Sequence, residues 1–187
     1  MVWKARFKQL VPVPLYNKLL LSFPFLYRTR LICYESNLQG GPAISELLSC
    51  LDNALHLQGN IIECGSSRCG TAIIMADHLG KRGYQKLVYA CDSFEGFNRA
   101  ELEVEVSQHR FPPEAGTWFT STSFEYVTRK IAVLGFNGAV VPIKGYFHDT
   151  LAKIDSSYCF AFIDCDLRES ARYCASVLWP RLVSSGI

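Results

Sequence analysis

Four short apolar runs alternate with helix-like stretches along this chain, and that alternation constrains the fold more than any other feature. Each run is followed by a glycine or a charged residue. The runs are residues 61–64, 87–91, 139–143 and 159–163, and the stretches with helical spacing are 42–55, 71–79, 124–134 and 168–179. Such alternation predicts a parallel sheet with helices on both faces. Pro142 in the third run has no N–H to donate to a neighbouring strand, so this strand is expected at the edge of the sheet.

The charge is distributed unevenly between the start of the chain and the rest. A length of 187 residues fits one domain, and a 49% hydrophobic share argues against disorder. The net charge of +2 does not indicate a nucleic-acid partner. Residues 1–30, however, hold six bases and no acid. We predict a basic arm or lid over residues 1–40, which is more suited to a homodimer contact than to a membrane surface, and a domain over 41–187.

The cysteines and the apolar runs indicate a cytoplasmic protein. The longest apolar run, residues 19–27, contains Pro24 and is far shorter than a membrane span of ~18 residues. Of the eight cysteines, four lie in or beside the strand-like runs, and those four form no C-x-x-C pair. They are typical of small, reduced core residues rather than of disulfides or a zinc site.

The residues at the carboxyl ends of the predicted strands point to a nucleoside site. Ligands of parallel sheets bind beyond these ends, where Glu63, Asp92, Lys144 and Asp164 are expected. A glycine-containing turn over residues 63–70 lets the chain approach a ligand at a helix start. Asp92 follows this turn by 22 residues and can accept both hydroxyls of a ribose.

The acid before the turn favours one nucleoside over another. Glu63 would place negative charge beside the pyrophosphate of a nicotinamide dinucleotide, whereas it would attract the ammonium and sulfonium groups of S-adenosylmethionine. The methyl donor is therefore the preferred cofactor. A purely structural role, in which Glu63 caps the following helix, is the alternative.

A second pair of acids follows the most apolar strand. Asp164 and Asp166 are two residues apart, a pattern that suits Mg²⁺ bound through one or two carboxylates and water. One acid can bind the metal while the other accepts a proton from a substrate hydroxyl. Alternatively, both acids stabilise the start of the helix at residue 168 through its dipole.

Five segments together resemble the macrocin O-methyltransferase family. They are NIIECG (60–65), ACDSFEGF (90–97), KGYFHDTL (144–151), FIDCDLRES (162–170) and WPRLVSSGI (179–187). The resemblance covers residues 40–187. It implies a Rossmann-like class I methyltransferase fold and transfer of a methyl group from S-adenosylmethionine, with Mg²⁺, to a hydroxyl of a sugar or other small natural product.

The resemblance also implies roles for individual residues. The methionine part of the donor is expected at Glu63 and Gly65, the ribose at Asp92 and Ser93, and the metal at Asp164, with Asp166 as the catalytic base. The full expected cofactor-binding set is Glu63, Cys64, Gly65, Ser66, Gly70, Asp92, Ser93 and Asp164. Residues 93–121 are expected to form a loop-rich wall over the acceptor, a small molecule with a hydroxyl group.

The sequence departs from the family pattern at three places. Cys69 stands where a glycine is usual, and Arg168 replaces a usual tyrosine. The chain also stops at Ile187, before an Asp-Asp pair that supplies further metal ligands in the family. Of the class I strand order 3-2-1-4-5-7-6, we expect strands 3-2-1-4, with the 5-7-6 part missing and strand four left as an exposed apolar edge.

Two alternative functions remain open at this stage. The first is a truncated remnant that binds S-adenosylmethionine without catalysis, because the Asp-Asp pair is absent. The second is an NAD-dependent oxidoreductase of the Rossmann type, which uses the same turn and acid.

Overall fold

A four-stranded parallel sheet forms the centre of the protein. The computed structural model describes residues 11–38 and 41–187. The strands are β1 (Asn60–Cys64), β2 (Val88–Asp92), β3 (Val140–Lys144) and β4 (Tyr158–Ile163). Their order is β3-β2-β1-β4, which confirms the predicted order 3-2-1-4. Pro142 lies on the edge strand β3, opposite Ala90 of β2.

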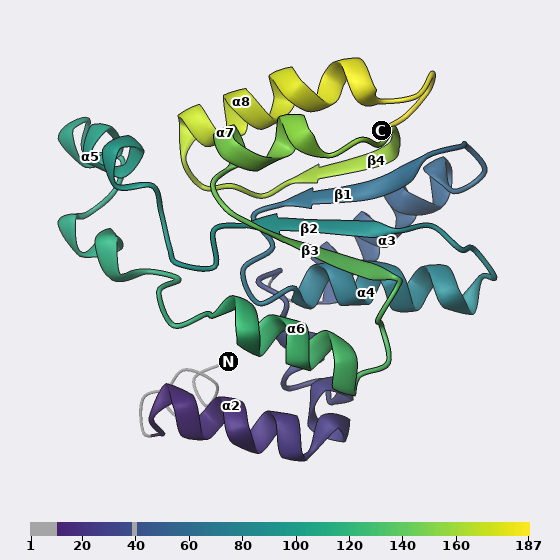
Figure 1. The fold of residues 1–187 in the computed structure, drawn as a ribbon, viewed down its shortest axis with the longest axis horizontal. Helices are drawn as coiled ribbons and strands as arrows, with labels where there is room; N and C mark the ends of the chain where they lie inside the picture. Colours follow the sequence, from purple (N-terminus) through teal and green to yellow (C-terminus); the bar gives the residue numbers. More distant parts are fainter. Residues whose placement is uncertain (1–10, 39–40) are drawn as a thin grey trace.

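Helices cover both faces of this sheet, as predicted. Helices α3 (Gly41–Ala54), α4 (Gly70–Lys81) and α6 (Phe124–Val133) share one hydrophobic core, and α7 (Phe147–Thr150) and α8 (Arg168–Leu178) lie on the other face (Figure 1). Successive residues of one strand enter different cores: Ile61 packs with the first group and Ile62 with the second. This is the period of two that an extended strand imposes on its side chains.

The segment after β2 is more regular than the sequence indicated. Residues 93–121 were expected to be loop-rich, but they contain α5 (Arg99–Ser107) and the 3₁₀ turn η3 (Pro113–Thr117). Asn98 caps α5 by accepting hydrogen bonds from the N–H groups of Ala100 and Glu101. The apolar stripe of α5 is weak because little of its surface is buried. In Figure 1, α5 projects beyond the carboxyl ends of the strands.

The described part of the N-terminal arm packs onto the helical layer. It contains α2 (Val13–Ser22), η1 (Pro24–Arg28) and η2 (Cys33–Glu35), and α2 lies against α6 (Figure 1). Leu20 and Tyr27 are buried in the same core as the sheet. The bases Lys4, Arg6 and Lys8 lie outside the described residues. Among residues 11–38 and 41–187, no helix is both long and apolar enough to cross a membrane.

β4 is the edge strand of the sheet, as expected, but the last residues of the chain cover the first part of its edge. The 3₁₀ turn η4 (Leu151–Lys153) precedes β4, and η5 (Trp179–Arg181) follows α8. The main chain of residues 182–187 then runs beside β4. The N–H of Val183 donates to Tyr158 O (2.9 Å), and the N–H of Ile187 donates to Cys159 O (3.0 Å). The N–H of Ala161 donates in turn to Ile187 O (2.7 Å). These bonds satisfy backbone groups of Tyr158, Cys159 and Ala161, which the strand would otherwise present to solvent.

The arm approaches the start of α4 at a position where only glycine fits. A Cβ atom on Gly70 would lie 2.2 Å from the backbone nitrogen of Ser36. The hydroxyl of Ser36 is hydrogen-bonded to that of Thr71 (2.7 Å) beside this contact. Gly70 therefore allows the arm to dock on α4. This helix follows residues 65–69, the turn that is predicted to bind the methyl donor and is called the donor turn below.

We expect Gly70→Ala to lower the free energy of unfolding by about 3 kcal/mol, the upper end for overpacking. Gly80 lies in the same helix with nothing within 4 Å of its would-be Cβ. Gly80→Ala is the matched control and is expected to raise the free energy of unfolding by about 0.5–1 kcal/mol. Urea unfolding of the two variants measures both values. Equal effects at the two positions would contradict the packing argument.

Candidate functional site

A pocket of about 450 Å³ lies at the carboxyl ends of β1, β2 and β4. Its size is within the range of small-molecule sites. The lining residues include Gly65, Asp92, Ser93, Asp164 and Asp166 from the predicted site. The structure thus brings the two predicted halves, the nucleoside side and the acid pair, into one cavity.

The turn after β1 is held in a strained conformation. Gly65 has φ +93°, and a Cβ there would lie 2.2 Å from the carbonyl oxygen of Asp164. Ser67 (φ 45°) and Cys69 (φ 53°) also adopt left-handed conformations, which cost non-glycine residues energy. Cys69 is the position where a glycine is usual in the family, and its positive φ shows why glycine is favoured there.

Asp92 is fixed at the end of β2 by two backbone donors. Its Oδ2 accepts the N–H of Ser67 (2.8 Å), and its Oδ1 accepts the N–H of Phe94 (2.7 Å). Burial raises the pKa of Asp92, and these two hydrogen bonds act in the opposite direction. The carboxylate lines the pocket and keeps lone pairs that can accept hydroxyl groups.

Glu63 lies beneath the pocket rather than on its wall. Glu63 is only 2% exposed, and its Oε2 has no hydrogen-bond partner among the described residues. Burial raises the pKa of Glu63 to about 8, with Asp164 and Asp92 adding to the increase. A pKa raised this far reduces the negative charge of Glu63 at neutral pH, and so weakens the expected repulsion of a pyrophosphate. A cation beside Oε2 would lower this pKa and restore the charge.

Asp164 and Asp166 both line the pocket at the end of β4. Burial and then the charge of Asp166 raise the pKa of Asp164, and burial raises the pKa of Asp166. The described residues provide neither acid with a salt bridge. Two acids without a basic partner fit a hard cation that completes its ligands with water. Within the described ranges, however, no group of three or more His, Cys, Asp or Glu side chains is suited to hold a metal.

Four residues of the predicted cofactor set do not line the pocket: Glu63, described above, and Cys64, Ser66 and Gly70. Cys64 and Ser66 are buried, and Ser66 donates to the carbonyl of Glu63 (3.4 Å). Gly70 lies against the arm. Their neighbours in sequence, Gly65 and Ser67, provide the wall instead.

The structure adds pocket residues that sequence reasoning missed. Ser67 lines the wall and holds Asp92; its place inside the glycine turn was the available signal. Asn37 and Leu38 reach the pocket from the arm, and no local pattern indicated them. Tyr146 and Phe147 come from the segment KGYFHDTL, which the resemblance had singled out without assigning them a role.

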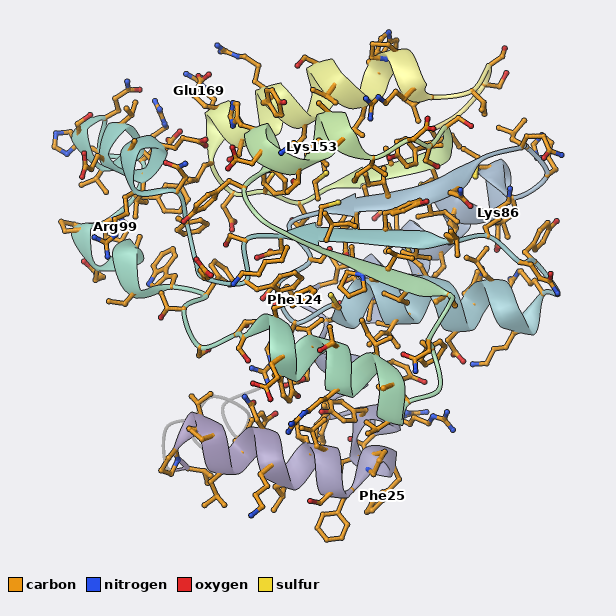
Figure 2. All side chains as sticks on the ribbon, in the orientation of Figure 1. Phe25, Lys86, Arg99, Phe124, Lys153 and Glu169 are labelled. Carbon is orange, nitrogen blue, oxygen red and sulfur yellow. The ribbon has the colours of Figure 1, made fainter. Side chains whose placement is uncertain are left out.

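An aromatic cluster forms the side of the pocket under α5. The ring of Phe97 contacts those of Phe119 (5.3 Å between centroids) and Phe111 (5.8 Å), and Trp118 packs on Phe111. Phe97, Asn98 and Phe119 line the cavity. In Figure 2 the labelled Arg99, next to this wall, and Lys86 lie at opposite ends of the sheet.

Comparison with known proteins identifies the family. The sequence model of the macrocin O-methyltransferase (TylF) family matches residues 37–187. The chain belongs to this family. Membership makes it a methyltransferase and favours a methyl donor over a nicotinamide dinucleotide. No curated protein sequence matches the chain.

Solved structures of methyltransferases share the fold. The O-methyltransferase NovP aligns with a TM-score of 0.60 and 18% identity, covering 91% of this chain and 80% of its own. The calicheamicin methyltransferase CalS11 aligns with a TM-score of 0.61 and 19% identity, covering 93% and 74%. At these identities the comparison establishes the Rossmann-like methyltransferase fold of this TylF-family member.

The pKa of Glu63 predicts how stability depends on pH. Between the ordinary pKa of 4.5 and about 8, the folded protein keeps a proton that the unfolded chain releases. Raising the pH through this window therefore lowers the free energy of unfolding, by up to roughly 5 kcal/mol at ~1.4 kcal/mol per pKa unit. Glu63→Gln removes this loss because the amide stays neutral.

Urea unfolding at pH 5 and pH 8 tests this expectation. The stability of Glu63→Gln relative to the unmodified protein should rise between the two pH values. Glu125 is exposed on α6, so Glu125→Gln is a control that should not alter the pH dependence. Parallel pH curves for the unmodified protein and Glu63→Gln would show that Glu63 does not carry the effect.

Proposed function

We propose that this protein transfers a methyl group from S-adenosylmethionine to a hydroxyl of a sugar or another small natural product, with Mg²⁺ assistance. The observation that carries the proposal is the joining of Asp92 and the Asp164–Asp166 pair in one pocket of a TylF-family protein. Asp92 is suited to bind a nucleoside, and the Asp164–Asp166 pair is suited to activate a hydroxyl.

The donor fits the residues around the turn after β1. Asp92 would accept the ribose hydroxyls, since two backbone donors already fix its orientation. Gly65 lines the pocket and would face the methionine part. The unpartnered Oε2 of Glu63 lies two residues away and suits the positive charge of the donor.

The acceptor would occupy the side of the pocket under α5. Phe97, Phe119 and Tyr146 provide apolar and aromatic surface there, which is suited to the face of a sugar ring or a polycyclic product. A further structure of CalS11 is described as a TDP-rhamnose 3′-O-methyltransferase of calicheamicin biosynthesis; it aligns with a TM-score of 0.50 and 16% identity, covering 98% of this chain and 72% of that one. That description supports a sugar hydroxyl as the acceptor.

The acid pair would bind the metal and accept the proton of the acceptor hydroxyl. Asp164 would hold Mg²⁺, which when bound lowers the pKa of a hydroxyl near it. Asp166 would accept the proton, and its raised pKa makes it a stronger base than an exposed aspartate. Because the sulfonium is already an activated donor, the remaining contribution of the protein is alignment of the two reactants and exclusion of water.

One observation favours the alternative of a non-catalytic donor-binding protein. The described residues contain no cluster of three metal-ligating side chains, so Mg²⁺ would depend on the acid pair, water and the acceptor. If Mg²⁺ does not bind to these groups, binding of the donor without transfer would be the only function of the pocket.

Donor binding can be tested by thermal shift with S-adenosylhomocysteine. A ligand that binds only the folded state stabilises it by about 2.7 kcal/mol at a hundredfold excess over Kd. We expect a clear rise of Tm for the unmodified protein and a much smaller one for Asp92→Asn. The control Asp155→Asn, at the amino end of β4, should respond like the unmodified protein. A response to NADH but not to S-adenosylhomocysteine would contradict the proposal.

Methyl transfer can be tested with a panel of nucleotide sugars and glycosylated natural products. Formation of S-adenosylhomocysteine should require an acceptor and rise with Mg²⁺. Asp166→Asn should lower kcat by about 10²-fold or more, the usual contribution of a general base, while Asp155→Asn leaves it unchanged. Donor binding with no transfer to any acceptor would favour the non-catalytic alternative.

A further inference from the structure

A cluster of buried charges joins the N-terminal arm to the donor turn and to α6. Glu35 of the arm receives a hydrogen bond from Arg68 of the turn (Nε to Oε1, 2.8 Å) and an ion pair from Lys130 of α6 (Nζ to Oε2, 3.1 Å). The three side chains are at most 7% exposed. Tyr126 also donates its hydroxyl to Glu35 Oε2 (2.6 Å).

Lys130 binds the main chain of both segments that it joins. Its ammonium donates to the carbonyl of Arg68 in the turn (2.7 Å) and to the carbonyl of Tyr34 in the arm (2.6 Å). With Glu35 as the third acceptor, all three N–H donors are used. One fully buried lysine thus fixes the distance between the turn and the arm.

The conformation of both segments requires such a restraint. Ser67 and Cys69 flank Arg68 and have positive φ angles, and Tyr34 and Glu35 of the arm also lie in the left-handed region. Strained backbone of this kind persists only where the surroundings hold it in place. The held segments then reach the pocket. Ser67 lines it and orients Asp92, and Asn37 and Leu38, which also line it, lie two and three residues after Glu35.

The arm also holds the side chain of Arg68 from α2. Asn17 Oδ1 accepts a hydrogen bond from Arg68 Nη2 (2.6 Å), and the guanidinium lies over the ring of Tyr126 (4.2 Å to the centroid). Asn17 does not line the pocket, so any effect of Asn17 on the donor must pass through Arg68.

We propose that Lys130 and Glu35 are positioning residues for the methyl donor, which clamp the turn at residues 65–69 to the arm and so preorganise the site. The proposal rests on the proposed function, because it needs S-adenosylmethionine to bind at this turn. Preorganisation raises affinity by removing the cost of ordering the turn at the moment of binding. The affinity of the donor is therefore coupled to a cluster whose charged groups do not touch it.

The test is the Kd of S-adenosylhomocysteine by calorimetry, at a temperature where circular dichroism shows every variant folded. Lys130→Met removes both main-chain bonds but leaves Glu35 paired with Arg68, so no net charge is stranded. We expect its Kd to rise about tenfold, within the usual range of coupling between sites. Asn17→Ala should raise the Kd by a smaller factor with little change of Tm. If Lys130→Met does not fold, the Kd of Asn17→Ala tests the positioning role.

Lys86→Met is the matched control. Lys86 also donates to two backbone carbonyls, those of Leu57 (2.5 Å) and Gly59 (2.9 Å), but at the opposite end of the sheet (Figure 2). Its loss should lower Tm without moving the Kd, because a purely structural contribution leaves the affinity of the folded protein unchanged.

The outcomes separate this proposal from the proposed function. If the unmodified protein does not bind S-adenosylhomocysteine, the proposed function fails and the clamp has no donor to position. If it binds, but Asn17→Ala and Lys130→Met bind equally well, the positioning role alone is overturned. The same holds if Lys86→Met weakens binding as much as Lys130→Met.

Discussion

The close approach of Gly65 to Asp164 is the contact on which the rest of the pocket depends. The two backbones are so near that a Cβ on Gly65 would lie 2.2 Å from the Asp164 carbonyl oxygen. This contact continues the pairing of β1 with β4 past the ends of the strands, where the N–H of Asp164 donates to Cys64 O (2.8 Å). It places the donor turn beside the acid pair, so both halves of the site open into one cavity. A side chain at residue 65 would therefore force the ends of the two strands apart.

Two buried acids, Glu35 and Glu63, differ in whether basic side chains are paired with them. Burial alone would raise the pKa of Glu35, but Lys130 and Arg68 beside it hold the pKa below its ordinary value. Glu63 is just as deeply buried, yet it has no base to pair with, and its pKa rises. The first acid is satisfied within the protein and fixes structure, whereas the second keeps an unpartnered oxygen beneath the pocket. An unsatisfied buried group is costly, which is why it marks a place where a ligand can contribute the missing partner.

Much of the sheet could be predicted from the chain itself, and the reasons are local. The apolar runs identified all four strands, and Pro142 correctly indicated the edge position of β3. The predictions failed where contacts between distant segments decide the outcome. The first part of the β4 edge is covered by residues 182–187, and a run of apolar residues carries no sign of the segment that will lie beside it. Gly70 was assigned to the cofactor from its place in the turn, but its lack of a side chain serves the docking of Ser36.

The sequence by itself determined the four strands, the residues at their carboxyl ends and the family to which these motifs belong, and the resemblance to that family implied the strand order. Strand periodicity and motif spacing are properties of consecutive residues, so they can be read without the fold. Only the tertiary structure decided that Asp92 is held by Ser67, that burial raises the pKa of Glu63, and that Glu35, Arg68 and Lys130 form one cluster. Glu35 and Lys130 are 95 positions apart in the chain. Hydrogen bonding, desolvation and ion pairing depend on distance in space, and the distance between such residues is fixed only when the arm, the turn and α6 pack together.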